Sequence, residues 1–324
     1  MAAPTGGGKR PPTRERFPAR PPDGGPRIRT PKPPWLKIRL QTGEPYKSVR
    51  RTLDTLSLHT VCEEARCPNI FECWGERTAT FIIMGDICTR RCGFCAVMTG
   101  TPGPLDPGEP ARLAEAVERM GLAHAVITSV DRDDLPDGGA AHFAAVIRAV
   151  RGRRPGCAVE VLTPDFRGAP GAVRILMEAM PDVFAHNIET VPRLYRAVRP
   201  GSVYRHSLSL LSRARDLGAP VTKSGFMLGL GEERAEIREV LSDLREAGVG
   251  ILTVGQYLQP TGGHLPVSRY VPPEEFEEIR GEALALGFQH AEAGPLVRSS
   301  YHASRHLKGI PGKGQAAPGE GGEP

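Results

Sequence analysis

The chain has 324 residues, 40% of them apolar and 24% charged, so it can bury the core of one large domain or two ordinary ones. No run of eighteen apolar residues occurs, which excludes a membrane-spanning helix, and no secretory signal pattern is present, so we expect a cytoplasmic protein. Residues 1–40 hold ten Lys or Arg against two acids, so the rest of the chain is mildly acidic despite the formal net charge of +5, which argues against a nucleic-acid partner.

Both ends of the chain differ in composition from the middle. Residues 1–34 contain ten Pro and five Gly and almost no large apolar side chains, which predicts disorder. Residues 35–40 alternate weakly between apolar and polar side chains and can form a short docked strand. We divide the chain into a disordered basic tail at 1–34, an N-terminal extension at 35–78, a barrel at 79–290, a C-terminal segment at 291–310 and a second disordered tail at 311–324.

Short apolar runs alternate with amphipathic stretches through the middle of the chain. We predict strands at 80–84, 125–129, 159–162, 183–188, 221–227 and 251–256. We predict helices at 109–120, 139–151, 169–180, 204–217, 232–247 and 273–286. Six strand-then-helix units predict an α/β fold with parallel strands, either a partial (β/α)6 TIM-type barrel or an open twisted sheet. In both arrangements function is expected at the carboxyl ends of the strands.

Six of the seven cysteines lie within 34 residues. An odd count without a secretory signal argues against a disulfide framework and favours metal binding. Cys88, Cys92 and Cys95 follow the first predicted strand with CX3CX2C spacing. Three thiolates are one too few for a closed structural zinc site, whereas a four-iron cluster held by three cysteines leaves one iron open to a substrate or cofactor. A zinc loop is the alternative interpretation.

A second group of three cysteines precedes the barrel. Cys62, Cys67 and Cys73 have CX4CX5C spacing, and again no fourth cysteine is nearby. The remaining Cys157 lies alone between a predicted helix and a predicted strand, and we expect it to be a thiol without a special function.

The CX3CX2C motif resembles the signature of the radical S-adenosylmethionine superfamily. The resemblance implies a 4Fe–4S cluster on Cys88, Cys92 and Cys95, with S-adenosylmethionine on the open iron. One electron from that cluster then yields a 5′-deoxyadenosyl radical. Residues 128–140, 186–191, 222–232 and 256–260 resemble the lipoyl synthase family within this superfamily and begin at or just after predicted strand ends.

The pair of cysteine motifs narrows the resemblance to the lipoyl synthase family. In that family the N-terminal cysteines, here Cys62, Cys67 and Cys73, hold an auxiliary 4Fe–4S cluster. Its fourth ligand is a serine hydroxyl in an Arg-Ser-Ser-Tyr motif, which this chain has at 298–301. The resemblance implies that Ser300 is the ligand, with Ser299 as the second choice.

Five residues are candidates for binding S-adenosylmethionine. Phe94 places an aromatic face beside the cysteine loop, where a nucleobase can pack. Asn187 and Glu189 follow the fourth strand and can bond ribose hydroxyls, or else act as a cap and a surface charge. Lys223 lies in the fifth strand segment, and a buried lysine there needs a negative partner, either the cofactor carboxylate or an acidic residue. Arg199 can anchor a carboxylate or lie on the surface.

Other polar residues near predicted strand ends carry weaker signals. Asp131, Asp133 and Asp134 together are typical of a solvated turn, although near a sulfonium cation they can lower the cost of binding it. Gln256 and Gln259 can line the same pocket.

The resemblance also implies an activity. A lipoyl synthase is a sulfurtransferase that inserts sulfur at C6 and C8 of an octanoyl chain on a carrier-domain lysine, using sulfide from the auxiliary cluster. Its partners are octanoylated 2-oxoacid dehydrogenase E2 subunits and the glycine cleavage H protein, with an electron donor such as ferredoxin or flavodoxin. Two alternatives remain: another radical enzyme such as a methylthiotransferase, and a two-cluster electron carrier.

Overall fold

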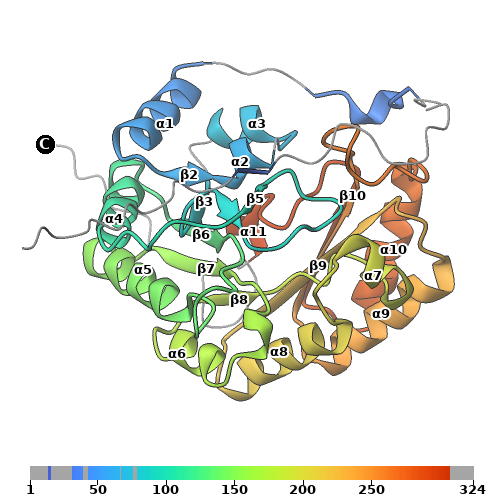
Figure 1. Ribbon diagram of the computed structural model, residues 1–324. Helices are drawn as coiled ribbons and strands as arrows, with labels where there is room; N and C mark the ends of the chain where they lie inside the picture. Colours follow the sequence, from blue (N-terminus) through green and yellow to red (C-terminus); the bar gives the residue numbers. More distant parts are fainter. Residues whose placement is uncertain (1–13, 16–30, 39–42, 66, 76–78, 307–324) are drawn as a thin grey trace, which may run out of the picture.

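The structure is a computed structural model that describes residues 14–15, 31–38, 43–65, 67–75 and 79–306 (Figure 1). The tail predicted at 311–324 lies outside the described residues, and so does most of the tail predicted at 1–34. Within the described part, no helix has both the length and the apolar character needed to cross a membrane.

A single large sheet organises the described residues. Its eight strands pair in the order β11-β10-β9-β8-β7-β6-β3-β2, and every pairing is parallel except that of the edge strand β2. The strands are β2 (His59–Thr60), β3 (Thr80–Ile83), β6 (His124–Ser129), β7 (Ala158–Leu162), β8 (Val183–Ala185), β9 (Thr222–Leu228), β10 (Ile251–Gln256) and β11 (His290–Gly294). A small sheet joins β1 (Arg14–Glu15), β5 (Met98–Gly100) and β4 (Ile87–Cys88).

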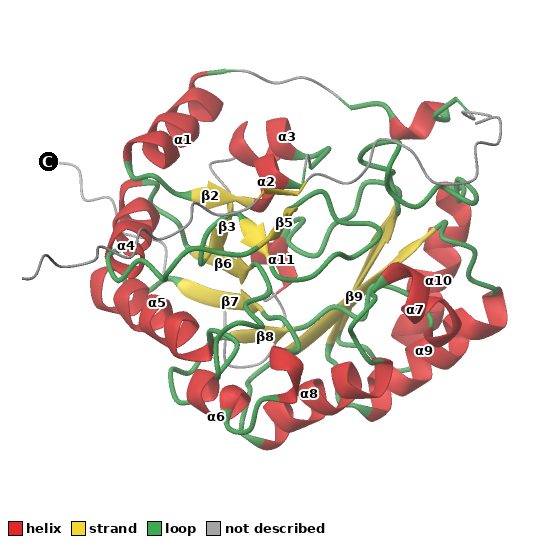
Figure 2. Ribbon diagram, viewed as in Figure 1, coloured by secondary structure: helices red, strands yellow, loops and turns green. Residues whose placement is uncertain are grey.

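Helices cover the outer face of the curved large sheet (Figure 2). Those that follow its strands are α4 (Glu109–Arg119), α5 (Ala140–Arg153), α6 (Ala172–Met177), α7 (Tyr195–Val198), α8 (Tyr204–Asp216), α9 (Arg234–Glu246) and α10 (Pro273–Ala285). The extension contributes α1 (Glu44–Thr55), α2 (Val61–Glu64) and α3 (Ile70–Gly75), and the chain ends its described part in α11 (Ala303–His306). Short 3-10 helices lie at η1 (Pro34–Leu36), η2 (Phe166–Gly168) and η3 (Pro192–Leu194).

The predicted α/β fold is confirmed, and the structure decides between its two forms. Six strand-and-helix units are present, but within the described residues the edge strands β2 and β11 do not pair with each other, so the barrel is partial and open. The sequence analysis missed both edge strands. The strand expected at 35–40 is also wrong, because Pro34 begins the 3-10 helix η1, which buries Leu36. A proline lacks the N–H that a strand ladder requires.

A buried ionic cluster occupies the interior near the amino ends of three strands. Lys223 near the start of β9 donates from Nζ to Glu160 Oε1 of β7 at 2.7 Å, and His124 Nε2 at the start of β6 lies 3.2 Å from Glu160 Oε2. Burial alone would raise the pKa of Glu160, but the charge of Lys223 and the contact with His124 outweigh it and lower the pKa to about 2. The cluster links β6, β7 and β9 near their amino ends, away from the carboxyl ends of the strands.

We expect Glu160→Gln to lower the free energy of unfolding by about 3–5 kcal/mol, because it leaves the Lys223 ammonium as an uncompensated buried charge. Urea unfolding followed by circular dichroism measures this, and the double variant Glu160→Gln, Lys223→Met should recover part of the loss. The folded-state pKa of Glu160 lies below its usual 4.5. The contribution of Glu160 to the free energy of unfolding of the wild type is therefore present above pH 4.5 and is lost as the pH falls towards 2. An unchanged urea midpoint in Glu160→Gln would contradict this account.

Candidate active site

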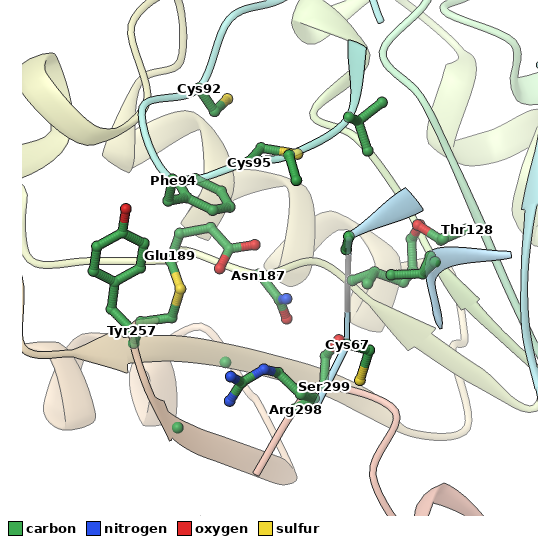
Figure 3. Close-up of a pocket in the computed structure, with 18 of the residues that line it drawn as sticks. Cys67, Cys92, Phe94, Cys95, Thr128, Asn187, Glu189, Tyr257, Arg298 and Ser299 are labelled. Atoms are coloured by element: carbon green, nitrogen blue, oxygen red, sulfur yellow. The ribbon is translucent and has the colours of Figure 1, made fainter. Parts of the chain in front are cut away.

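A cavity of about 550 Å³ opens at the carboxyl ends of the strands. Its wall includes residues at or near the ends of β6, β7, β9 and β10, and the three CX3CX2C cysteines with Phe94. In Figure 3, Cys92, Phe94 and Cys95 lie on one side of this cavity, while Cys67, Arg298 and Ser299 lie on the other. A volume in the range of about 300–1,000 Å³ is typical of small-molecule sites.

Arg90, inside the CX3CX2C motif, anchors the cysteine loop. Its guanidinium bonds both oxygens of Asp133 at 2.8 Å and both oxygens of Asp165 at 2.9 and 2.6 Å, and it lies 3.5 Å from Asp131. Burial alone would raise the pKa of Asp165, but Arg90 lowers it to about 2. Two bidentate pairs on one buried guanidinium fix both its position and its plane. The loop that carries Cys88 and Cys92 is therefore tied to the segments that follow β6 and β7.

The acidic run after β6 is not a solvated turn, because two of its carboxylates are engaged by arginine side chains. Asp133 is bound to Arg90, and Asp134 accepts from Arg132 at 2.9 and 2.8 Å. Asp131 lines the cavity, and its backbone N–H donates to Cys88 Sγ at 3.3 Å. Burial raises the pKa of the Asp131 carboxyl. The run is thus a loop anchor, and of its three acids only Asp131 borders the large cavity among the described residues.

Asn187, Glu189 and Arg199 meet on the wall of the large cavity, as Figure 3 shows for the first two. Glu189 has φ 65°, a left-handed backbone conformation rare for a non-glycine residue. Its N–H bonds Gly225 O and its carbonyl accepts from Met227, which holds this strained residue against β9. Burial raises the pKa of Glu189. Arg199 donates to Asn187 O at 2.7 Å, so the three residues form one connected unit.

Several buried polar atoms on this wall have no hydrogen-bond partner among the described residues. They are Ser129 Oγ, Asn187 Oδ1 and Arg199 Nε. Unpaired buried polar atoms cost free energy unless a ligand or water satisfies them. Together with three thiols, they make the cavity chemically suited to a polar cofactor beside an iron–sulfur cluster.

The structure does not bring Lys223 to the large cavity. Its ammonium is fully buried and pairs with Glu160, so the acidic residue is its negative partner. Gln256 and Gln259 do line the cavity, but their amides are engaged with the backbone. Gln256 Nε2 donates to Leu228 O at 3.1 Å, and Gln259 Nε2 donates to His264 O at 2.8 Å.

A second, small cavity gathers the N-terminal cysteines. Cys62, Cys67, Cys73 and Ser300 all line it, with Thr80 and Arg298 among their neighbours. Ser299 instead lines the large cavity, which favours Ser300 over Ser299 as the oxygen that accompanies the three thiols. Cys67 and Arg298 line both cavities. The two cysteine groups therefore border adjoining spaces that share a wall.

Hydrogen bonds join the C-terminal segment to the extension around this small cavity. Asn69 Nδ2 donates to Leu296 O at 2.7 Å, and Tyr301 OH donates to Glu72 Oε1 at 3.0 Å. Gly255 in β10 lets the segment approach, because a Cβ there would collide with the Val297 carbonyl. These contacts bring Ser300 to cysteines that precede it by more than 220 residues.

Neither cysteine group has the arrangement of a single-ion site. Within the described residues, no three His, Cys, Asp or Glu side chains are placed so that they could hold one metal ion. A zinc site needs its donors within about 2.3 Å of one ion. In a cubane cluster each of three thiolates binds a different iron, so the thiols stand further apart.

Comparisons with known proteins agree with this geometry. The radical SAM superfamily matches residues 82–244, and the N-terminal domain of lipoyl synthase matches residues 22–67. The lipoyl synthase of Rubrobacter xylanophilus is 59% identical over 88% of this chain and 92% of its own length. That of Methylococcus capsulatus is 60% identical over 85% of this chain and 86% of its own length. The chain belongs to the lipoyl synthase family.

A solved structure supports the fold of this lipoyl synthase family member independently. Streptococcus suis SuiB bound to S-adenosylmethionine superposes with a TM-score of 0.52 at 13% identity, over 69% of this chain and 53% of SuiB. The chain thus spans about half the length of SuiB, and the likeness concerns the fold alone. Membership of the radical SAM superfamily implies a 4Fe–4S cluster and S-adenosylmethionine, and the large cavity has the donors that suit them.

The sequence analysis missed several residues of this lipoyl synthase family site. Arg90 lies between two of the cysteines, and Asp165 follows β7 by three residues. A charged residue inside a metal loop and an acid just beyond a neighbouring strand end were the available signals. Thr80 and Asn69 gave no comparable signal, because their hydrogen-bond partners Ser300 and Leu296 are distant in sequence.

We expect Arg90→Lys to reduce iron incorporation at the CX3CX2C site by about 10–100-fold in affinity, because an ammonium cannot form two bidentate pairs. Iron content and the electron paramagnetic resonance signal of the reduced cluster measure this. Arg91→Lys, an exposed position in the same loop, is the matched control. Equal iron content in the two variants would show that Arg90 does not position the loop.

Proposed function

We propose that the chain is a lipoyl synthase that converts an octanoyl-lysine of a carrier protein into the lipoyl group. The observation that carries the proposal is a pair of adjoining cavities. Cys88, Cys92 and Cys95 border the large one, Cys62, Cys67 and Cys73 border the small one, and Cys67 and Arg298 line both. Sulfur insertion needs a hydrogen-abstracting centre and a sulfur source on opposite sides of one alkyl chain. Adjoining sites satisfy that requirement.

In this proposal Cys88, Cys92 and Cys95 hold the radical SAM 4Fe–4S cluster. When bound, that cluster and S-adenosylmethionine supply the radical that removes hydrogen from C6 and then C8, chemistry beyond any side-chain acid or base. The Glu189 carboxylate and the unpartnered Asn187 Oδ1 would accept hydrogen bonds from the ribose hydroxyls of the cofactor. The aromatic face of Phe94 on the same wall packs against its base.

The remaining cationic candidate on this wall is Arg199. Its buried guanidinium has one nitrogen without a partner among the described residues. Burial alone would lower the pKa of Arg199, but nearby tyrosine, carboxylate and thiol groups outweigh burial and raise it. A permanently charged donor suits the cofactor carboxylate. Lys223 does not line the large cavity. It stabilises the strands behind this wall through its ion pair with Glu160.

The small cavity is the proposed site of the auxiliary 4Fe–4S cluster, which is a substrate here because it gives up sulfide. Cys62, Cys67 and Cys73 supply three thiolates, and Ser300 supplies an oxygen. Oxygen is a harder and less well matched ligand for iron–sulfur clusters than a thiolate. One exchangeable ligand therefore makes the cluster easier to open. We propose that residues 35–78 and 291–310 form this site together.

Apolar side chains give the octanoyl chain a path through the large cavity. Phe226 and Met227 line it from β9, and Ile38, Val61 and Phe71 line it on the side of the extension. Burying methylenes contributes about 0.8 kcal/mol each, so an eight-carbon chain is retained without polar contacts. The proposed partners are octanoylated 2-oxoacid dehydrogenase E2 subunits and the glycine cleavage H protein, with ferredoxin or flavodoxin as electron donor.

The reconstituted protein should convert an octanoyl-lysine peptide to the dihydrolipoyl form in the presence of S-adenosylmethionine and a reductant, as measured by mass spectrometry. We expect Cys62→Ala to abolish sulfur insertion while S-adenosylmethionine cleavage continues, because the radical site keeps all its ligands. Ser300→Ala should impair insertion and Ser299→Ala should not. Full lipoyl product from Cys62→Ala would refute the assignment of the small cavity as sulfur source.

We expect Asn187→Ala to raise the KM for S-adenosylmethionine by about tenfold, because a buried hydrogen bond to the cofactor is lost. Steady-state formation of 5′-deoxyadenosine against cofactor concentration measures it. The iron content should stay at the wild-type value, since Asn187 binds no iron in this assignment. An unchanged KM would place the cofactor elsewhere in the cavity.

A further inference from the structure

Thr80 contacts two of the four proposed auxiliary-cluster ligands. Its hydroxyl Oγ1 donates to Ser300 Oγ at 2.7 Å, and its backbone N–H faces the sulfur of Cys62 and lowers the pKa of that thiol against the larger effect of burial. Thr80 is 5% exposed and lines the small cavity with both ligands. One residue thus links the amino-terminal and carboxyl-terminal parts of the site.

The backbone of Thr80 is held rigidly. As the first residue of β3 it pairs with Val126 of β6, and the next residue, Phe81, pairs with Thr60 of β2. Thr60 also caps α2, the short helix that carries Cys62. A group on a paired strand holds a neighbour more accurately than one on a loop does.

Ser300, in contrast, lies in a turn that leads into α11. In this turn the Ser300 carbonyl accepts from the Ala303 N–H at 3.2 Å, and His302 has a left-handed φ of 53°. A serine side chain has three staggered rotamers of similar energy. The bond from Thr80 selects the one in which Oγ lines the small cavity.

We propose that Thr80 is the positioning residue that fixes the Ser300 hydroxyl in the auxiliary site. This inference rests on the proposed function, since it assumes that Ser300 binds iron there. Thr80 has no role at the radical site in this account. Its hydroxyl, rather than its methyl group, is the part that acts.

Two substitutions separate a hydrogen-bonding role from a packing role. Thr80→Val keeps the shape and the strand preference but removes the donor, and Thr80→Ser keeps the donor but removes a methyl group. The readout is the rate at which iron passes to a chelator. It is measured by absorbance on anaerobic full-length protein that holds both clusters. The release phase that is missing from Cys62→Ala identifies the auxiliary site, and the other phase is an internal control.

We expect Thr80→Val to release auxiliary-site iron about fivefold faster, the effect of one lost hydrogen bond, while Thr80→Ser stays within about twofold of wild type. In a Ser300→Ala background Thr80→Val should add nothing, because the two residues act through one bond. The reverse order, with Thr80→Ser faster and Thr80→Val unchanged, would overturn the inference in favour of packing. A wild-type protein with about four irons instead of about eight would overturn the proposed function itself.

Discussion

The segment that follows β11 has to reach the extension that precedes β3, and the rest of the site depends on this connection. The sheet is open between β11 and β2 within the described residues, so no strand pairing holds its two edges together. Hydrogen bonds from Asn69 to Leu296 and from Thr80 to Ser300 join the parts of the chain at those edges instead. Side chains, rather than strand pairing, bridge the gap between the two sheet edges. This leaves room for a cavity on each side of the connecting segment.

Two buried clusters of charged side chains lie at opposite ends of the strands that form the large cavity. The Lys223–Glu160 pair lies near the amino ends of the strands, where it is sealed from solvent. Arg90 and its two bidentate aspartates lie at the carboxyl ends, beside the cysteine loop. Both clusters are satisfied internally, which explains why they can be buried. Among the described residues, the buried polar atoms without a partner include Ser129 Oγ, Asn187 Oδ1 and Arg199 Nε on the wall of the large cavity, where a bound cofactor can pair with them.

The topology explains why radical chemistry and sulfur delivery can share one chain. Parallel strands place the ends of β6, β7, β9 and β10 around one opening, and the cysteine loop, Asn187, Glu189 and Arg199 line that opening. The extension and the C-terminal segment add a second cavity that shares Cys67 and Arg298 with the first. Lipoyl synthases at 59% and 60% identity align with 88% and 85% of this chain.

Local signals determined much of what the sequence alone predicted. Three features depend on neighbours within a few residues, which constrain one another directly. They are the six βα units, the two cysteine spacings and the position of Asn187 and Glu189 after a strand. The tertiary structure decided the open barrel, the strands β2 and β11, the pairing of Lys223 with Glu160 and the use of Asp133 and Asp165 by Arg90. It also decided that Ser300 lines the small cavity and Ser299 the large one. The side-chain contacts among these join residues 43 to 220 positions apart. The distance between such atoms is set by the packing of whole elements, which no local pattern encodes.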